Sequence, residues 1–245
     1  FESTLNALIT AHGIETSLVF LDEKGHKGID LGVNLETTDS LFQISLTPLN
    51  PILAYRKFNV NADNHITINQ KDHIQANMNL LADDGTALRL YSLPDTNAEQ
   101  DITLSITNFN LGELSNVLPF MPMITGMLNG DIHAVKETEQ ATLSVDMDVK
   151  EMGYEGSPLG DIGLGLIYFP NNDGSHLVDG ILSQNQRDII LVNGRYWTEN
   201  EEGQIEAEAH LQRLPLNMAN GFITDNLARL EGYISGILDV RGPVS

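Results

Sequence analysis

The sequence contains no cysteine, a single tryptophan, and only 13 Lys and Arg residues against 34 Asp and Glu residues. The absence of cysteine excludes a disulfide scaffold, a cysteine-ligated metal and a thiol nucleophile. The formal net charge of −21 excludes nucleic acid as a partner, because phosphate contacts need a basic footprint. It also argues against docking on anionic membrane surfaces, which requires clustered Lys and Arg.

Long apolar runs are missing as well. No stretch of about 18 apolar residues occurs, so the sequence predicts no membrane-spanning helix. The chain begins at Phe1 without a recognisable signal peptide. We therefore expect a segment of a longer polypeptide whose targeting signals lie elsewhere. Its 245 residues are enough for a sizeable core.

Alternation of apolar and polar residues with a period of two dominates the chain and predicts strands with one apolar face. The alternating runs cover residues 42–46, 65–69, 74–80, 101–107, 141–149 and 204–211, and residues 162–166 alternate apolar residues with glycine. Asp84-Gly85, Asp173-Gly174 and Glu202-Gly203 separate such runs and are typical of tight hairpins. The sequence thus predicts an all-β fold with an elongated antiparallel sheet.

Helical spacing is confined to short segments, which predict two or three short helices that dock on the sheet. These segments carry apolar residues at Leu111, Leu114, Val117 and Leu118 before Pro119, and at Leu216, Ala219, Phe222, Ile223, Leu227 and Leu230. The unit of strand, short helix, G-x-x-x-G and strand occurs twice, with Gly126 and Gly130 in one copy and Gly232 and Gly236 in the other. We interpret residues 1–245 as one elongated segment with weak sub-repeats at about 1–100, 101–204 and 205–245, the last incomplete.

This repeated pattern resembles the TamB/AsmA-like family of periplasmic bridges. The motif is carried by Leu214-Pro215-Leu216 and by Gly232 through Gly242, and the first copy by Phe109-Asn110-Leu111 with its glycine pair. The resemblance covers residues 101–245, and residues 131–134 depart from the D-V-x-G ending of the motif. It implies a sheet curled into a half-pipe whose apolar interior conducts phospholipid across the periplasm. It further implies a parent protein anchored in the inner membrane and an Omp85-type, TamA-like barrel as partner. Assistance in outer-membrane protein assembly is implied beside, or in place of, lipid passage.

The candidate groove consists of the apolar residues of the alternating strands. They are Ile102, Leu104, Ile106, Leu143, Val145, Met147, Ile162, Leu164, Leu166, Ile205, Ala207 and Leu211. A strand of that length spans about 17–20 Å, against about 15 Å for half the hydrocarbon core of a bilayer. From the residues alone, the closed core of a sandwich or barrel is favoured over an open trough. The resemblance reverses that preference, and a closed β-sandwich interaction or adhesin module is the alternative.

Signals for catalysis or metal binding are weak, and we expect neither an enzyme nor a cofactor. The seven histidines form no metal-binding pair, and Asn59-x-Asn61-x-Asp63 lacks the Gly and Glu of a calcium loop, which favours an Asx-rich turn. No G-x-S-x-G elbow occurs. The paired carboxylates that a glycosidase would need are Asp146/Asp148, Glu201/Glu202 and Glu206/Glu208. We interpret them as parts of a solvated sheet face.

Overall fold

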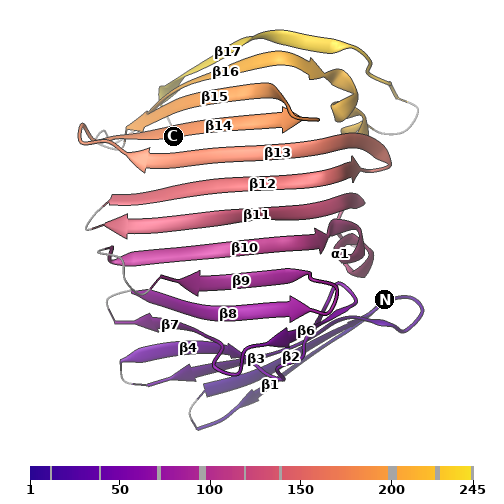
Figure 1. Ribbon diagram of the computed structural model, residues 1–245, viewed down its shortest axis with the longest axis vertical. Coiled ribbons are helices and arrows are strands. Elements are labelled where there is room, and N and C mark those ends of the chain that lie inside the picture. Colours follow the sequence, from indigo (N-terminus) through magenta and orange to yellow (C-terminus); the bar gives the residue numbers. More distant parts are fainter. Residues whose placement is uncertain are drawn as a thin grey trace.

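The described part of the chain forms a single antiparallel sheet of 17 strands with two short helices (Figure 1). The computed structural model describes residues 1–11, 13–38, 40–70, 73–93, 98–118, 120–137, 140–197, 203–223 and 227–243. The all-β prediction is confirmed. The N-terminal strands are β1 (Glu2–Ile9), β2 (Gly13–Leu21), β3 (Lys27–Thr37), β4 (Leu41–Leu46), β5 (Ile52–Leu53), β6 (Arg56–Val60), β7 (His65–Asn69), β8 (Ile74–Ala82) and β9 (Ala87–Ser92).

The C-terminal part is a meander of longer strands, each paired with the next. It comprises β10 (Gln100–Asn110), α1 (Leu111–Val117), β11 (Ile124–Glu137), β12 (Gln140–Tyr154), β13 (Ser157–Pro170), β14 (Ser175–Gln184), β15 (Arg187–Trp197), β16 (Gln204–Pro215), the 3-10 helix η1 (Leu216–Phe222) and β17 (Tyr233–Pro243). The helices occupy the two segments with helical spacing. Pro119, the expected helix stop, lies outside the described residues.

The N-terminal part is less regular because, at two places in the sheet, two short strands lie end to end beside one longer strand. β3 pairs with β4 along one half and with β5 along the other, and β8 likewise pairs with both β7 and β6. β9 then joins this part to the meander by pairing with β10. Of the turns predicted from the sequence, Asp84-Gly85 and Asp173-Gly174 do connect neighbouring strands, and both glycines have positive φ. Glu202, in the third predicted turn, lies outside the described residues.

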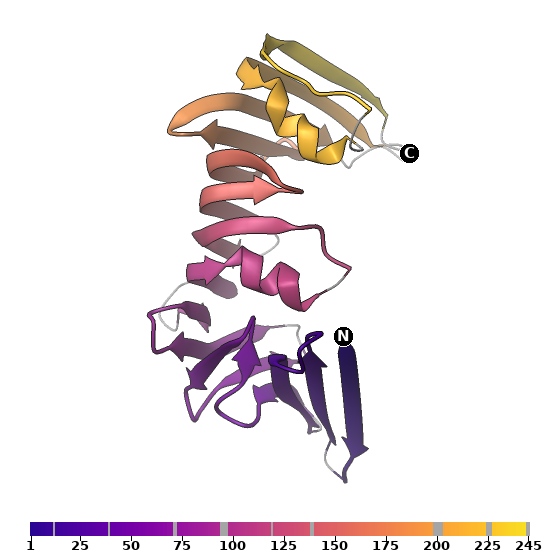
Figure 2. The same ribbon diagram turned by 90° about the vertical axis from the view of Figure 1, so that its right-hand side faces the viewer.

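The sheet is strongly curved. Seen along its strands, it bends so that β1 and β17, at its two ends, lie on the same side of the molecule (Figure 2). The inside of the bend is identified by its packing, because Leu31 of β3 and Leu46 of β4 lie in one cluster with Leu80 and Leu88 of β8 and β9. Side chains of such separated strands meet only on the concave face.

The N-terminal part of the concave face is closed by a conventional hydrophobic core. Leu46, Phe58, Val60, Leu80 and Ala82 are buried there, and Phe58 is completely inaccessible to solvent. Phe58 and Val60 come from β6, which pairs with the C-terminal half of β8 and brings its apolar residues into the bend. In this part the apolar concave face is covered, because β5 and β6 supply side chains that pack over it.

Candidate functional site

Cross-strand pairing aligns the apolar residues of β10 to β17 into three parallel rows on the concave face, here called the groove rows. The first row is Ile102, Ala134, Leu143, Tyr168, Val178, Gly194, Ala207 and Val240. The second row is Leu104, Ile132, Val145, Leu166, Gly180, Val192, Ala209 and Leu238. The third row is Ile106, Gly130, Met147, Leu164, Leu182, Ile190, Leu211 and Gly236.

All twelve residues singled out from the sequence lie on this one face. Ten belong to the groove rows themselves. Ile162 continues β13 beside Leu164, opposite Val149, and Ile205 continues β16 beside Ala207, opposite Tyr196. The alternation of each strand thus specifies the face, and the register places neighbouring strands in phase.

The groove rows are open to solvent along their length. None of their Leu, Ile, Val, Met or Tyr side chains is buried, and Leu164 in the middle of the sheet is 41% exposed. Among the residues that the structure describes between 100 and 243, the buried apolar ones are Phe109, Val117, Leu159 and Ile189. These four residues lie at the side of the sheet where α1 and η1 are found. The alternating pattern of the sequence did not identify them. The groove is therefore closed at one side only.

The first groove row extends past β10 through the N-terminal part of the sheet. It continues through Ser92, Ala76, Ile66, Ile44, Leu35, Ile14 and Ile9. Apart from Ser92, every residue of this extension is apolar, and only Ala76 is buried. One edge of the groove therefore runs from β17 to β1, while the core around Phe58 fills the remainder of the N-terminal end.

α1 closes its side of the groove by packing and by hydrogen bonds. Val117 is 1% exposed and lies against Gly28 of β3, where an added Cβ would come within 2.4 Å of the Val117 Cγ2 atom. The Asn110 side chain caps the helix by accepting hydrogen bonds from the backbone N–H groups of Gly112 (2.9 Å) and Glu113 (3.4 Å). Only glycine at position 28 lets the helix approach this closely.

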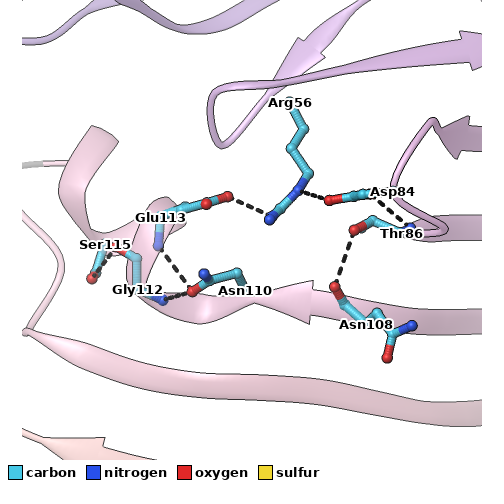
Figure 3. A network of polar contacts seen from close by, with 8 residues as sticks. All are labelled: Arg56, Asp84, Thr86, Asn108, Asn110, Gly112, Glu113 and Ser115. Atoms are coloured by element: carbon cyan, nitrogen blue, oxygen red, sulfur yellow. Dashed lines mark hydrogen bonds and ion pairs between the residues drawn. The ribbon is translucent and has the colours of Figure 1, made fainter.

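A polar network fixes α1 to the N-terminal part (Figure 3). Arg56 of β6 donates to Asp84 in the β8–β9 turn (Nε to Oδ2, 2.6 Å) and also forms an ion pair with Glu113 of α1. Asp84 in turn accepts a hydrogen bond from the backbone N–H of Thr86, and the Thr86 hydroxyl donates to the backbone oxygen of Asn108 (3.1 Å). The pKa of Asp84 is lowered to about 2, first by the Thr86 hydrogen bonds and then by Arg56.

η1 closes the other end of the same side. Phe222 stacks on Tyr154 of β12 with 4.5 Å between the ring centroids, and Gly221 sits where an added Cβ would come within 2.6 Å of the Tyr154 ring. Figure 1 shows α1 and η1 at the same end of the strands. The two copies of the repeat thus place their helices equivalently. Each also has a register shift just before its helix, at Ile106/Phe109 and Leu211/Leu214.

The convex face carries exposed carboxylates on β12 and β16, and exposed apolar residues at Ile167 of β13 and Ile181 of β14. The carboxylates of Asp146, Asp148, Glu206 and Glu208 are exposed there, with side chains opposite to the groove rows. Asp146 faces Asp131 directly across the ladder, and two carboxylates in this arrangement repel each other. The interpretation as a solvated face thus holds for these two pairs, and Glu201/Glu202 lie outside the described residues.

Asn61 and Asp63 form the Asx-rich turn expected from the sequence. The Asn61 amide donates to Asp63 Oδ1 (3.1 Å) and its oxygen accepts from the backbone N–H of Asn79 (2.8 Å). Asn77 donates to the other Asp63 oxygen, so these side chains are engaged with the protein. Within the described ranges, no group of three or more His, Asp or Glu residues is placed to hold a metal ion.

Comparisons of the chain with protein-family models, with curated proteins and with solved structures return no match. Neither of the helices in the described part of the chain is long and apolar enough to cross a bilayer.

Proposed function

We propose that the concave face is a lipid groove that holds acyl chains while they pass along the sheet. The observation that carries this proposal is that the three rows of apolar residues and glycine have no covering layer among the described residues. Soluble monomers rarely expose contiguous apolar patches above a few hundred Å², and such patches mark interaction sites. Each Å² of apolar surface covered by a chain contributes about 25 cal/mol, so binding needs no catalytic residue.

The open side of the groove suits a lipid better than a folded partner. A lipid needs apolar contact along its tail and water at its headgroup, and a half-pipe closed by helices on one side provides both. The acidic convex face keeps the outer surface hydrated and soluble. These properties agree with what the resemblance to TamB/AsmA-like proteins implies, namely phospholipid transfer between two membranes.

Site-specific photo-crosslinking tests the proposal. Benzoylphenylalanine is placed at Leu104, Val145 or Ala207 in the groove rows, with Ser144 and Glu206 as matched exposed positions on the convex face. The purified protein is irradiated with vesicles of phosphatidylethanolamine and phosphatidylglycerol, and lipid adducts are detected by mass spectrometry. We expect adducts at the three groove positions only. A folded protein with no adducts at the groove positions, or with equal adducts on both faces, would refute a lipid groove.

The resemblance also leads to a proposed setting, the periplasm, with an Omp85-type barrel as partner. Cross-linking in cells from the exposed position Ile167 on the convex face would capture such a barrel without disturbing the groove. Capture of an outer-membrane barrel is the expected outcome. Fractionation of the protein with the cytoplasm would reject this setting.

A further inference from the structure

The polarity of the concave face changes across the width of the groove. On β12 the apolar series runs from Val149, on the helix side, through Met147 and Val145 to Leu143. These six residue steps cover about 20 Å at 3.4 Å per residue. Tyr168 of the adjoining strand lies directly opposite Leu143, and His176 and Tyr196 lie one step further from the helices on the same face. The groove thus has an apolar helix side and a rim of different chemistry.

Three aromatic side chains form this rim. Tyr168, His176 and Tyr196 come from β13, β14 and β15, and cross-strand pairing places all three on the concave face. The Tyr168 hydroxyl lies 2.7 Å from His176 Nδ1, and their rings are nearly parallel at 5.7 Å between centroids. The Tyr196 ring follows at 6.1 Å from that of His176. The three rings make a continuous ladder across three strands.

The ladder leaves polar atoms accessible at the rim. All three residues are half-buried, so each remains partly in contact with water. When the Tyr168 hydroxyl donates to Nδ1, the neutral imidazole carries its proton on Nε2 and can donate it outward. Neither His176 Nε2 nor the Tyr196 hydroxyl has a hydrogen-bond partner in the described part of the chain. A Cβ added at Gly203 would lie 3.1 Å from the Tyr196 hydroxyl oxygen, so the backbone of Gly203 packs against this end of the ring.

We infer that the Tyr168–His176–Tyr196 ladder is a headgroup site that binds the phosphate and ester oxygens of a glycerophospholipid, an inference that rests on the proposed groove. Tyrosine is suited to such a boundary, since its ring is apolar and its hydroxyl is wet. Both free groups are donors, and the lipid oxygens are acceptors. The acyl chains then lie along the strands, with their ends toward α1 and η1 and their headgroups at the ladder.

Removal of the tyrosine hydroxyls tests this orientation. The variants are Tyr168→Phe, Tyr196→Phe and the double variant, with Tyr91→Phe as matched control, because Tyr91 lies on the convex face opposite Thr103. Dissociation constants are measured for dipalmitoyl phosphatidylethanolamine and for dipalmitoylglycerol, which has the same chains without the phosphate. One neutral hydrogen bond changes affinity by roughly two- to tenfold.

We expect the unaltered protein and the Tyr91→Phe control to bind the phospholipid about tenfold more tightly than the diacylglycerol. The double variant should lose this preference while its affinity for the diacylglycerol stays the same. Equal binding of both ligands by the unaltered protein, or a preference that survives in the double variant, overturns the headgroup site and leaves the groove standing. Binding of neither ligand overturns the groove itself.

Discussion

At the scale of single residues, equally apolar side chains have opposite surroundings in the two parts of the sheet. Phe58 is fully buried in the N-terminal core, whereas Leu164 on the same concave face is 41% exposed. The alternation in the sequence identifies the apolar face of β13, which carries Leu164, and of β8, which packs against Phe58. It does not distinguish a covered face from an open one, because the covering residues come from β6, and its pairing with β8 has no local signature.

This contrast predicts that shortening Phe58 and shortening Leu164 to alanine lower the free energy of unfolding by different amounts. Phe58→Ala should lower the free energy of unfolding by about 3–5 kcal/mol, because it leaves a cavity in a closed core. Leu164→Ala removes a side chain from an open groove and should cost less than about 1 kcal/mol. Urea unfolding followed by circular dichroism measures both. A cost for Leu164→Ala as large as that for Phe58→Ala would show that the groove is a closed core.

Asp84 predicts a pH dependence of stability. Its pKa is lowered from 3.8 to about 2, chiefly by the Thr86 hydrogen bonds and next by Arg56. A depressed carboxylate pKa stabilises the folded state above pH 4, and this contribution disappears as the pH falls toward 2. The difference in urea midpoint between the unaltered protein and Asp84→Asn should thus be largest above pH 4 and vanish near pH 2. A midpoint difference between the two proteins that stayed constant from pH 7 to pH 2 would contradict this origin.

At the scale of elements, the turns show what local sequence can and cannot predict. The Asp-Gly turns were recognisable because glycine readily takes positive φ. The turns Glu155-Gly156 and Asn185-Gln186 also have positive φ at both central residues, yet Gln186 is an uncommon residue there. The strands on either side force that conformation, since their register leaves only two residues for the connection. Tertiary pairing therefore determines this turn against the preference of the residue.

The Asn185-Gln186 turn can accordingly be improved. Gln186→Gly removes the cost of a left-handed conformation (φ 64°) and creates an Asn-Gly turn, so it should raise the free energy of unfolding by about 1 kcal/mol. Gln75→Gly, a matched change in the middle of the ladder between β7 and β8, should lower it instead. Both values come from urea unfolding. Destabilisation by Gln186→Gly would mean that the side chain, and not the strand register, holds the turn.

At the scale of the whole molecule, the sheet ends in two unprotected edges. Every residue of β1 is exposed, and so is all of β17 apart from one partly exposed glycine. The exposed apolar residues include Leu5 at one edge and Ile237 and Leu238 at the other. The sequence predicted an elongated antiparallel sheet, but it could not reveal which strands lie at its edges. Edge position depends on the complete order of pairing, which no single strand encodes.

Unprotected edges pair with other strands, so the chain in isolation should self-associate at high concentration. A lysine at an edge adds charge where a second strand would dock. We therefore expect Ile237→Lys in β17 to shift the sedimentation velocity profile toward the monomer. Ile167→Lys places the same charge on an equally exposed residue of the convex face, but in the centre of the sheet, and should leave association unchanged. If Ile167→Lys abolished association and Ile237→Lys did not, the two copies would contact each other through their convex faces. The edge strands would then not pair with a second copy.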